Sequence, residues 1–178
     1  MDAGAQVTLI TTPVSLTPPV GADVIHVETA KQMLDAVLNE LPKSDALIMA
    51  AAVADFKPKN QAEQKIKKEG GVPQIELEAT EDILKAVAGL RSGMKRLSVV
   101  AGFAAESQNL LQNASNKLQS KKLDMIAAND ISAEDAGFAV ETNRITLLFA
   151  DGRRESLSLM SKTEAADIII ERIAALLE

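Results

Sequence analysis

The sequence predicts a three-layer α/β fold, with a mainly parallel sheet, helices on both faces and a C-terminal antiparallel hairpin at one edge. Segments with strand and helix periodicity alternate along most of the 178 residues, as in parallel sheets whose strands are joined by helices. Two strand segments, residues 45–49 (DALIM) and 97–103 (LSVVAGF), are almost continuously apolar, which is typical of strands covered on both faces. This arrangement is Rossmann-like.

The N-terminal half supplies strands, a long loop and two helices. Strands are predicted at residues 6–10, 23–27, 45–49 and 74–78, with a proline-rich loop at 11–22. In residues 29–41 apolar side chains recur at helical spacing after Thr29, a good N-cap. A second helix is predicted at residues 81–90, capped by Thr80. The stretch 45–49 is expected to be a buried strand, and 56–71 a long irregular segment.

The C-terminal half continues the alternation and then changes period. A strand at 97–103, a helix at 107–122 and a strand at 124–128 come first. Residues 144–150 and 153–159 flank Asp151 and Gly152, a strong short signal for a β-hairpin. Ser161 and Glu164 have capping-box spacing, so a helix is expected from there through Leu177. Residues 1–178 are predicted to form a single nucleotide-binding domain.

Composition excludes several classes of protein. The net charge of −6 disfavours nucleic-acid binding, which depends on clustered Lys and Arg. The absence of cysteine excludes disulfides, thiol chemistry and Cys-ligated metal. No apolar run reaches the roughly 18 residues of a membrane span, and no signal-peptide pattern opens the chain. We therefore expect a cytoplasmic protein without membrane or nucleic-acid partners.

One acid and three lysines suggest a site for a phosphate-bearing substrate. Asp55 follows the strand at 45–49 and a run of small residues, where a ligand can approach the backbone closely. Lys65, Lys67 and Lys68 come about ten residues later, beside two glycines. Cations on a loop can meet developing negative charge. Two simpler interpretations remain open: Asp55 as a helix or turn cap and the lysines as a solvated charge run.

The chain shows no G-x-G-x-x-G or Walker pattern, although nucleotide-binding α/β folds usually begin with a strand, a Gly-rich turn and a helix. We therefore expect the chain to be a fragment that lacks this first βα unit.

Five motifs, in this order and spacing, resemble phosphopantothenoylcysteine synthetase, commonly the C-terminal half of a bifunctional bacterial enzyme of coenzyme A biosynthesis. They are TPVSL from Thr12, AAAVADF from Ala50, KIKK from Lys65, GFAAE from Gly102 and AAND from Ala127. The resemblance covers nearly the whole chain. It implies CTP-dependent joining of 4′-phosphopantothenate and L-cysteine through an acyl-cytidylate, with Mg²⁺ accompanying the nucleotide. It also implies a homodimer and a partner half that is a flavin-dependent decarboxylase, which alone binds FMN.

The resemblance further implies roles for individual residues. Lys65 matches the catalytic lysine that turns over the acyl-cytidylate. The remaining matched positions are implied to bind the nucleotide: Met49, Ala50, Ala51, Asp55, Lys67, Lys68, Thr80, Glu81, Asp82, Ile83, Phe103, Lys117 and Lys121. At Thr80 and Glu81 this sequence departs from the usual Asn-Pro of the family. The family's catalytic asparagine has no counterpart here, so we expect the chain alone to lack the full catalytic set. Metal ligands are not implied.

Two other functions remain open. A Rossmann-type NAD(P)-binding oxidoreductase suits the fold class, although the glycine fingerprint that such enzymes carry does not occur here. A non-catalytic assembly domain is the third hypothesis, with the hairpin edge pairing to a second copy.

Overall fold

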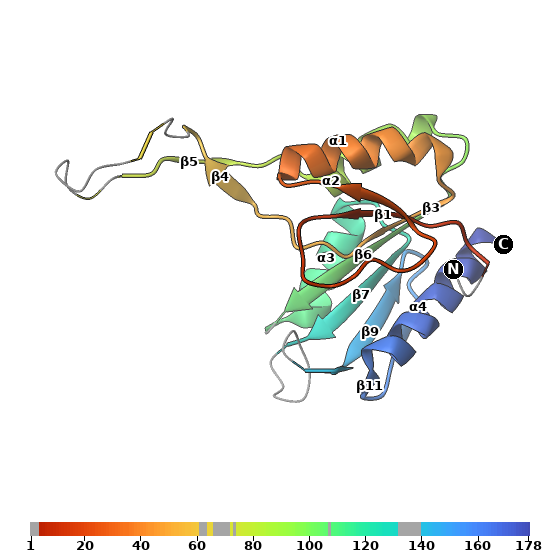
Figure 1. The fold of residues 1–178 in the computed structure, drawn as a ribbon. Helices are drawn as coiled ribbons and strands as arrows, with labels where there is room; N and C mark the ends of the chain where they lie inside the picture. The colour runs from red at the N-terminus through yellow and green to blue at the C-terminus, as the bar shows by residue number, and fades with distance from the viewer. Residues whose placement is uncertain (1–3, 61–63, 66–71, 73, 107, 132–139) are drawn as a thin grey trace. The chain divides into compact units, whose positions relative to one another are not determined.

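The computed structural model describes residues 4–60, 64–65, 72, 74–106, 108–131 and 140–178 (Figure 1). The chain forms two compact units. The first consists of Met1–Asn39 and Ala52–Ile83, and the second of Glu40–Ala51 and Leu84–Glu178. None of the helices in the described part of the chain is long and apolar enough to cross a bilayer.

A five-stranded sheet in the order β10-β9-β7-β6-β3 organises the second unit. Its strands are β3 (Ala46–Met49), β6 (Val99–Glu106), β7 (Met125–Asp130), β9 (Ile145–Phe149) and β10 (Arg154–Ser156). The first three are parallel, whereas β9 and β10 are antiparallel to their neighbours. The predicted hairpin at Asp151 and Gly152 is confirmed, with Gly152 at φ +89° as the tight turn requires.

Helices cover both faces of this sheet, as predicted. Alternate strand residues face opposite sides. Val99, Ala101, Met125 and Ala127 form one buried cluster with Ile169 and Ile173 of α4 (Lys162–Leu177). The opposite face lies under α2 (Ile83–Leu90) and α3 (Leu110–Ser120). There the side chains of Leu84 in α2 and Leu123, just after α3, occupy the space that a Cβ at Gly102 would enter.

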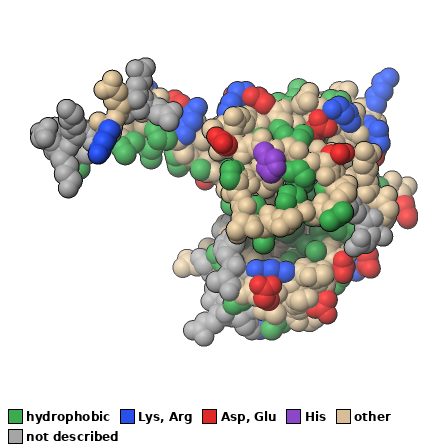
Figure 2. Space-filling view, viewed as in Figure 1, with side chains coloured by type: hydrophobic (Ala, Val, Ile, Leu, Met, Phe, Trp, Pro, Cys, Tyr) green, Lys and Arg blue, Asp and Glu red, His purple; other side chains and the backbone are tan. Residues whose placement is uncertain are grey.

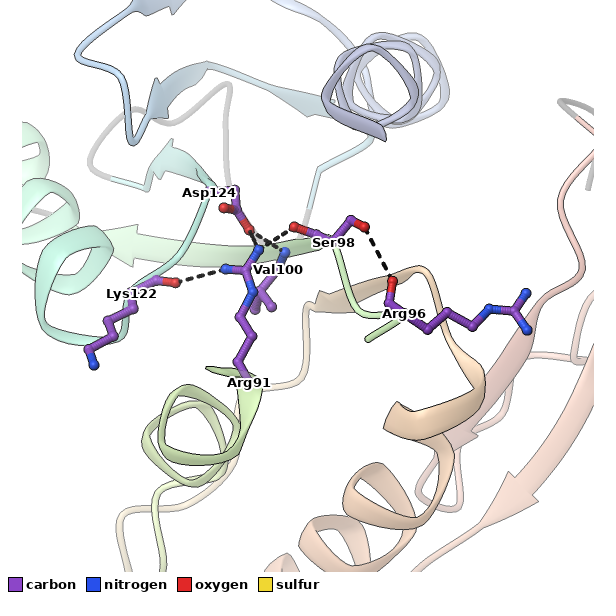
Figure 3. A network of polar contacts seen from close by, with 6 residues as sticks. All are labelled: Arg91, Arg96, Ser98, Val100, Lys122 and Asp124. Carbon is purple, nitrogen blue, oxygen red and sulfur yellow. Dashed lines mark hydrogen bonds and ion pairs between the residues drawn. The ribbon is translucent and has the colours of Figure 1, made fainter. Parts of the chain in front are cut away.

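An ion pair fastens the end of α2 to the amino-terminal ends of β6 and β7 (Figure 3). Arg91 Nη2 lies 2.7 Å from Asp124 Oδ2, which also accepts the Val100 N–H at 2.6 Å. The same guanidinium donates to the carbonyls of Ser98 and Lys122. One side chain therefore fixes three chain segments at this edge of the sheet.

The predicted caps of α1 (Ala30–Glu40) and α4 are confirmed. Thr29 Oγ1 accepts the Gln32 N–H at 3.1 Å, and the Gln32 side chain accepts the Thr29 N–H at 3.0 Å. Ser161 and Glu164 form the expected capping box, with bonds of 3.2 and 2.9 Å. These caps satisfy N–H groups that a helix start leaves unpaired.

The predictions for β3 and for the start of α2 are wrong. The strand at 45–49 is not buried: β3 is an edge of its sheet, and Ile48 is 41% exposed. Thr80 does not cap α2, because the helix begins only at Ile83. The Thr80 hydroxyl instead donates to the Ala54 carbonyl at 2.5 Å.

The first unit contains α1 through Asn39 and two pairs of strands. β1 (Thr8–Thr11) and β2 (Asp23–His26) are parallel, and β4 (Phe56–Pro58) and β5 (Leu77–Ala79) form an antiparallel ribbon. The segment predicted to be irregular from residue 56 therefore begins as a strand. In the second unit, β8 (Thr142–Asn143) and β11 (Met160–Ser161) form a further short pair that the sequence did not predict.

The β4–β5 ribbon has one charged and one apolar face. Lys57 and Lys59 pair with Glu78 and Glu76 at 3.1 and 3.4 Å. Alternation places Phe56, Pro58, Ile75, Leu77 and Ala79 on the other face. Phe56, Ile75 and Leu77 are 60–66% exposed, and Figure 2 shows hydrophobic side chains gathered along the ribbon.

Candidate functional site

The carboxyl ends of three parallel strands meet at one edge of the five-stranded sheet. β3 ends at Met49, whereas β6 and β7 run on to Glu106 and Asp130. The last pair between β3 and β6 is Met49 with Gly102. From Phe103 onward, β6 therefore has no strand of the described residues paired with it on the β3 side. In open α/β sheets, ligands bind beyond this kind of edge.

The carbonyl of Phe103 faces the gap left by β3. The Val99 N–H donates to Asp45, next to β3, while the Val100 carbonyl accepts from Asp124, next to β7. Because backbone groups alternate along a strand, the groups of Phe103 point to the β3 side. If β3 continued in register, the next donor to this carbonyl would be the Ala51 N–H.

Lys117 of α3 takes the place of that missing donor. Its Nζ donates to the Phe103 carbonyl at 2.8 Å. A cation thus lies where β3 stops pairing with β6. Ala50 and Ala51, the two residues that follow β3, are exposed. Lys121 follows one helical turn later, half-buried at the end of α3, and its N–H donates to the Lys117 carbonyl at 3.0 Å. The structure therefore brings the predicted residues Met49, Phe103 and Lys117 together within the second unit, where Ala50 and Ala51 directly follow Met49 and Lys121 lies one turn along α3.

The side chain of Phe103 lies on the α4 face of the sheet. It is half-buried and packs against the buried cluster of strand and α4 residues. Phe103 therefore offers its carbonyl to Lys117, while its half-buried side chain lies on the α4 face.

The first unit holds the other predicted residues. The Thr80 N–H donates to the Asp55 carbonyl at 2.9 Å, which joins these two segments where the ribbon begins. The Asp55 side chain is exposed, as is that of Glu81. Asp82 immediately precedes α2. Ile83 is only 4% exposed, so its side chain belongs to the core and only its backbone can serve a ligand.

The lysine motif is described only in part. Lys65 is exposed, and Lys67 and Lys68 lie outside the described residues. The roles implied for all three remain predictions.

Two features of this edge were not predicted from the sequence. Asn129, the next-to-last residue of β7, has a buried Oδ1 that no hydrogen-bond donor reaches within the described structure. Asn129 belongs to the AAND motif, but the resemblance implied no role for it. Asn109, at the start of α3, has φ +51° and makes no side-chain cap, which leaves the first N–H groups of α3 without a side-chain acceptor from that residue.

A surface groove of about 460 Å³ lies elsewhere in the second unit, between α3 and the β9–β10 hairpin. Leu118, Lys122, Leu148 and Arg153 help to line it. Its lining includes none of the residues predicted to bind the nucleotide.

Comparisons with known proteins agree on one family. Residues 1–177 match the model described as "DNA/pantothenate metabolism flavoprotein C-terminal domain". The chain is 44% identical over 177 residues to the "Coenzyme A biosynthesis bifunctional protein CoaBC" of Bacillus subtilis (strain 168). The match covers 99% of this chain and 43% of that protein. A "Cysteine/Cysteine sulfinic acid decarboxylase" from an unknown prokaryotic organism is 39% identical over 174 residues, 97% of this chain and 48% of that one.

Solved structures share the fold. The C-terminal domain of a CoaBC protein superposes with a TM-score of 0.79 at 35% identity, over 99% of this chain and 78% of that one. The DNA/pantothenate metabolism flavoprotein from Streptococcus pneumoniae gives the same TM-score at 21% identity, over 98% and 82% of the two chains, and supports the fold alone. The chain spans less than half the length of the two full-length relatives above. Its sequence and its fold place it in the family of the DNA/pantothenate metabolism flavoprotein C-terminal domain.

Proposed function

We propose that this chain is the ligase half of a coenzyme A biosynthesis protein, joining 4′-phosphopantothenate to L-cysteine at the expense of CTP. The single observation that carries the proposal is the Lys117 ammonium at the carboxyl end of β3, bonded to the Phe103 carbonyl. It supplies a cation where open α/β sheets bind nucleotides. The 44% identity to a CoaBC protein supports the choice of reaction class.

The reaction has two steps. A carboxylate oxygen of 4′-phosphopantothenate attacks the α-phosphorus of CTP, which forms an acyl-cytidylate and releases pyrophosphate. The amine of cysteine then attacks the acyl carbon. CMP leaves with the bonding electron pair, and the amine loses a proton as the amide forms.

The residues of the second unit are suited to holding the nucleotide. Lys117 and Lys121 present two cations from one face of α3. A triphosphate competes with the Phe103 carbonyl for Lys117, because a charge-assisted bond to phosphate is stronger than one to a neutral carbonyl. Ala50 and Ala51, which follow Met49, have small exposed side chains that leave the backbone open for close approach.

The predicted residues of the first unit also have proposed roles. Asp55 contacts the nucleotide, and Glu81, Asp82 and Ile83 offer backbone N–H groups at the start of α2. The Thr80 N–H is bonded to the Asp55 carbonyl, so Thr80 positions Asp55 beside the nucleotide. Lys65 stabilises charge that develops on the activated carboxyl group, aided by Lys67 and Lys68.

Mg²⁺ fits this site as a companion of the nucleotide. Within the described residues, no group of three His, Asp or Glu side chains is placed to hold a metal. Mg²⁺ typically binds through substrate phosphates and one or two carboxylates, retaining several waters, and Asp55 is an exposed carboxylate in the predicted set. When bound, the ion offsets phosphate charge. FMN belongs to the decarboxylase half and not to this chain.

The β4–β5 ribbon supports a homodimer. A two-stranded ribbon is marginally stable by itself, and this one exposes Phe56, Ile75 and Leu77 on one face. Pairing of two such faces across a two-fold axis would bury both and is self-complementary. The other proposed partner is a decarboxylase domain in the same polypeptide, as in the bifunctional relatives.

Nucleotide selectivity tests the proposal against the two other functions. The melting temperature of the protein is measured with Mg²⁺ and saturating CTP, NAD⁺ or NADP⁺. A ligand that binds only the folded state raises this temperature. We expect CTP alone to raise it. A rise with NAD⁺ or NADP⁺ but not CTP would favour an oxidoreductase, and no rise with any of them a non-catalytic domain.

A further inference from the structure

The amide oxygen of Asn129 is a buried acceptor at the ligand-binding edge of the sheet. Its Oδ1 is shielded from solvent and receives no hydrogen bond within the described structure. Leaving such an atom unpaired costs stability, and native proteins seldom do so without a reason. The residue as a whole is only half-buried, so the amide lies close to the surface where β7 ends.

A neighbouring side chain engages one end of this amide. The Asn129 Nδ2 donates to Oδ1 of Asn143 on β8, at 3.4 Å. An amide that is free to rotate by 180° offers either a donor or an acceptor to a ligand. Here the donor is engaged by Asn143, so the free position is an acceptor.

Register places Asn129 beside Phe103. The pairs between β6 and β7 include Phe103 with Ala127 and Ala105 with Asn129. Phe103 and Asn129 therefore lie on the same face of the sheet as diagonal neighbours. A single planar group, such as a nucleotide base, can contact both side chains. A base that packs against Phe103 would present its edge toward Asn129.

We propose that Asn129 Oδ1 accepts a hydrogen bond from the exocyclic amino group of the nucleotide base, and that Asn129 thereby selects cytosine over uracil. This inference rests on the proposed CTP-dependent function and adds the residue that reads the base. Cytosine carries an amino donor at C4, whereas uracil carries a carbonyl acceptor at the same position. Two acceptors facing each other leave both unpaired, so UTP is rejected.

The test compares the Kd values of CTP and UTP, each with Mg²⁺, by calorimetric titration of the protein. The unmodified protein is expected to bind CTP at least about tenfold more tightly than UTP, as one buried hydrogen bond allows. Asn129→Leu should raise the Kd for CTP by about the same factor and change the Kd for UTP little. Asn129→Asp retains an acceptor and should retain the preference.

Asn143→Ala provides a second arm that leaves Asn129 in place. Without Asn143, the Asn129 Nδ2 loses its acceptor and the amide can turn. The protein should then bind UTP more tightly, and the Kd values for CTP and UTP should become more similar. This variant changes only an edge residue of a two-residue strand, and it keeps the inference testable if Asn129→Leu fails to fold.

The possible outcomes test base selection by Asn129 separately from the proposed CTP-dependent function. An unchanged ratio of the Kd values for CTP and UTP in Asn129→Leu or in Asn143→Ala would overturn the inference while leaving CTP binding intact. Failure of the unmodified protein to bind CTP would overturn both.

Discussion

Arg172 on α4 holds the carboxylate of Glu155 on β10 with two parallel hydrogen bonds. Its Nε lies 2.8 Å from Oε2, and its Nη2 lies 2.8 Å from Oε1. These hydrogen bonds and the guanidinium charge lower the pKa of Glu155 from its usual 4.5, although slight burial opposes them. The pair fastens the C-terminal helix to the outer strand of the sheet.

The pair makes stability dependent on pH. Because the folded-state pKa of Glu155 is lowered, its contribution is present above about pH 4.5 and disappears as the pH falls through the folded-state pKa. Glu155→Gln should lower the free energy of unfolding at pH 7 by about 0.5–1 kcal/mol, a value already reduced for partial exposure. Urea unfolding at pH 7 and pH 3 should show a smaller loss at pH 3 than at pH 7.

Glu171→Gln is the matched control for this pair. Glu171 also contacts Arg172, at 3.4 Å, but its side chain is 69% exposed. Its loss should leave stability nearly unchanged at both pH values. Equal effects of the two substitutions would contradict the importance of the bidentate geometry.

Gly102 is required for the close approach of Leu123 to the sheet. A Cβ at Gly102 would lie 2.8 Å from Leu123 Cδ1. Gly102→Ala should therefore lower the free energy of unfolding by about 1–3 kcal/mol, the usual cost of overpacking. Gly89→Ala, inside α2 with open space around it, should instead raise it by up to about 1 kcal/mol. Thermal unfolding of both variants tests this contrast.

The ion pair of Arg91 and Asp124 should contribute more than an exposed pair of the same kind. Asp124 is 28% exposed and accepts the Val100 N–H as well as Arg91. Asp124→Asn should lower the free energy of unfolding by about 1–3 kcal/mol. Asp45→Asn, which removes the exposed partner of Arg96, should cost much less. Equilibrium unfolding in urea would show the order of the two variants, and the reverse order would contradict this account.

The apolar face of the β4–β5 ribbon should control the oligomeric state. Leu77→Asp places a charge on the proposed contact and should convert dimers to monomers, because burying an unpaired charge is unfavourable. Val20→Asp is a matched control, since Val20 is 93% exposed on a loop outside the ribbon. Light scattering after size-exclusion chromatography measures the mass. A monomeric parent protein, or a dimeric Leu77→Asp variant, would rule out this interface.

Features encoded by neighbouring residues were predictable from the sequence. The hairpin at Asp151 and Gly152, the Thr29 cap and the Ser161–Glu164 capping box each depend on residues within a few positions of one another. The mainly parallel sheet with helices on both faces followed from the alternation of strand and helix patterns.

Features set by the ends and edges of strands were not predictable. An apolar run such as that of β3 is expected in a buried strand, yet Ile48 lies at an edge. Lys117 reaches the Phe103 carbonyl only because β3 ends before β6. The unpaired Asn129 oxygen likewise depends on which side chains surround the end of β7. No pattern in a single sequence shows where one strand stops relative to its neighbour.

The most direct test of the central claim is the affinity for CTP of Lys117→Gln, compared with Lys95→Gln as the control that removes an exposed lysine. Calorimetric titration with Mg²⁺ at physiological salt gives both values. If Lys117 binds the triphosphate at the end of β3, Lys117→Gln should raise the Kd for CTP by about tenfold or more, the value of one charge-assisted hydrogen bond. Lys95→Gln should leave the Kd unchanged. Equal CTP affinity in the two variants would contradict the placement of the nucleotide at this edge of the sheet.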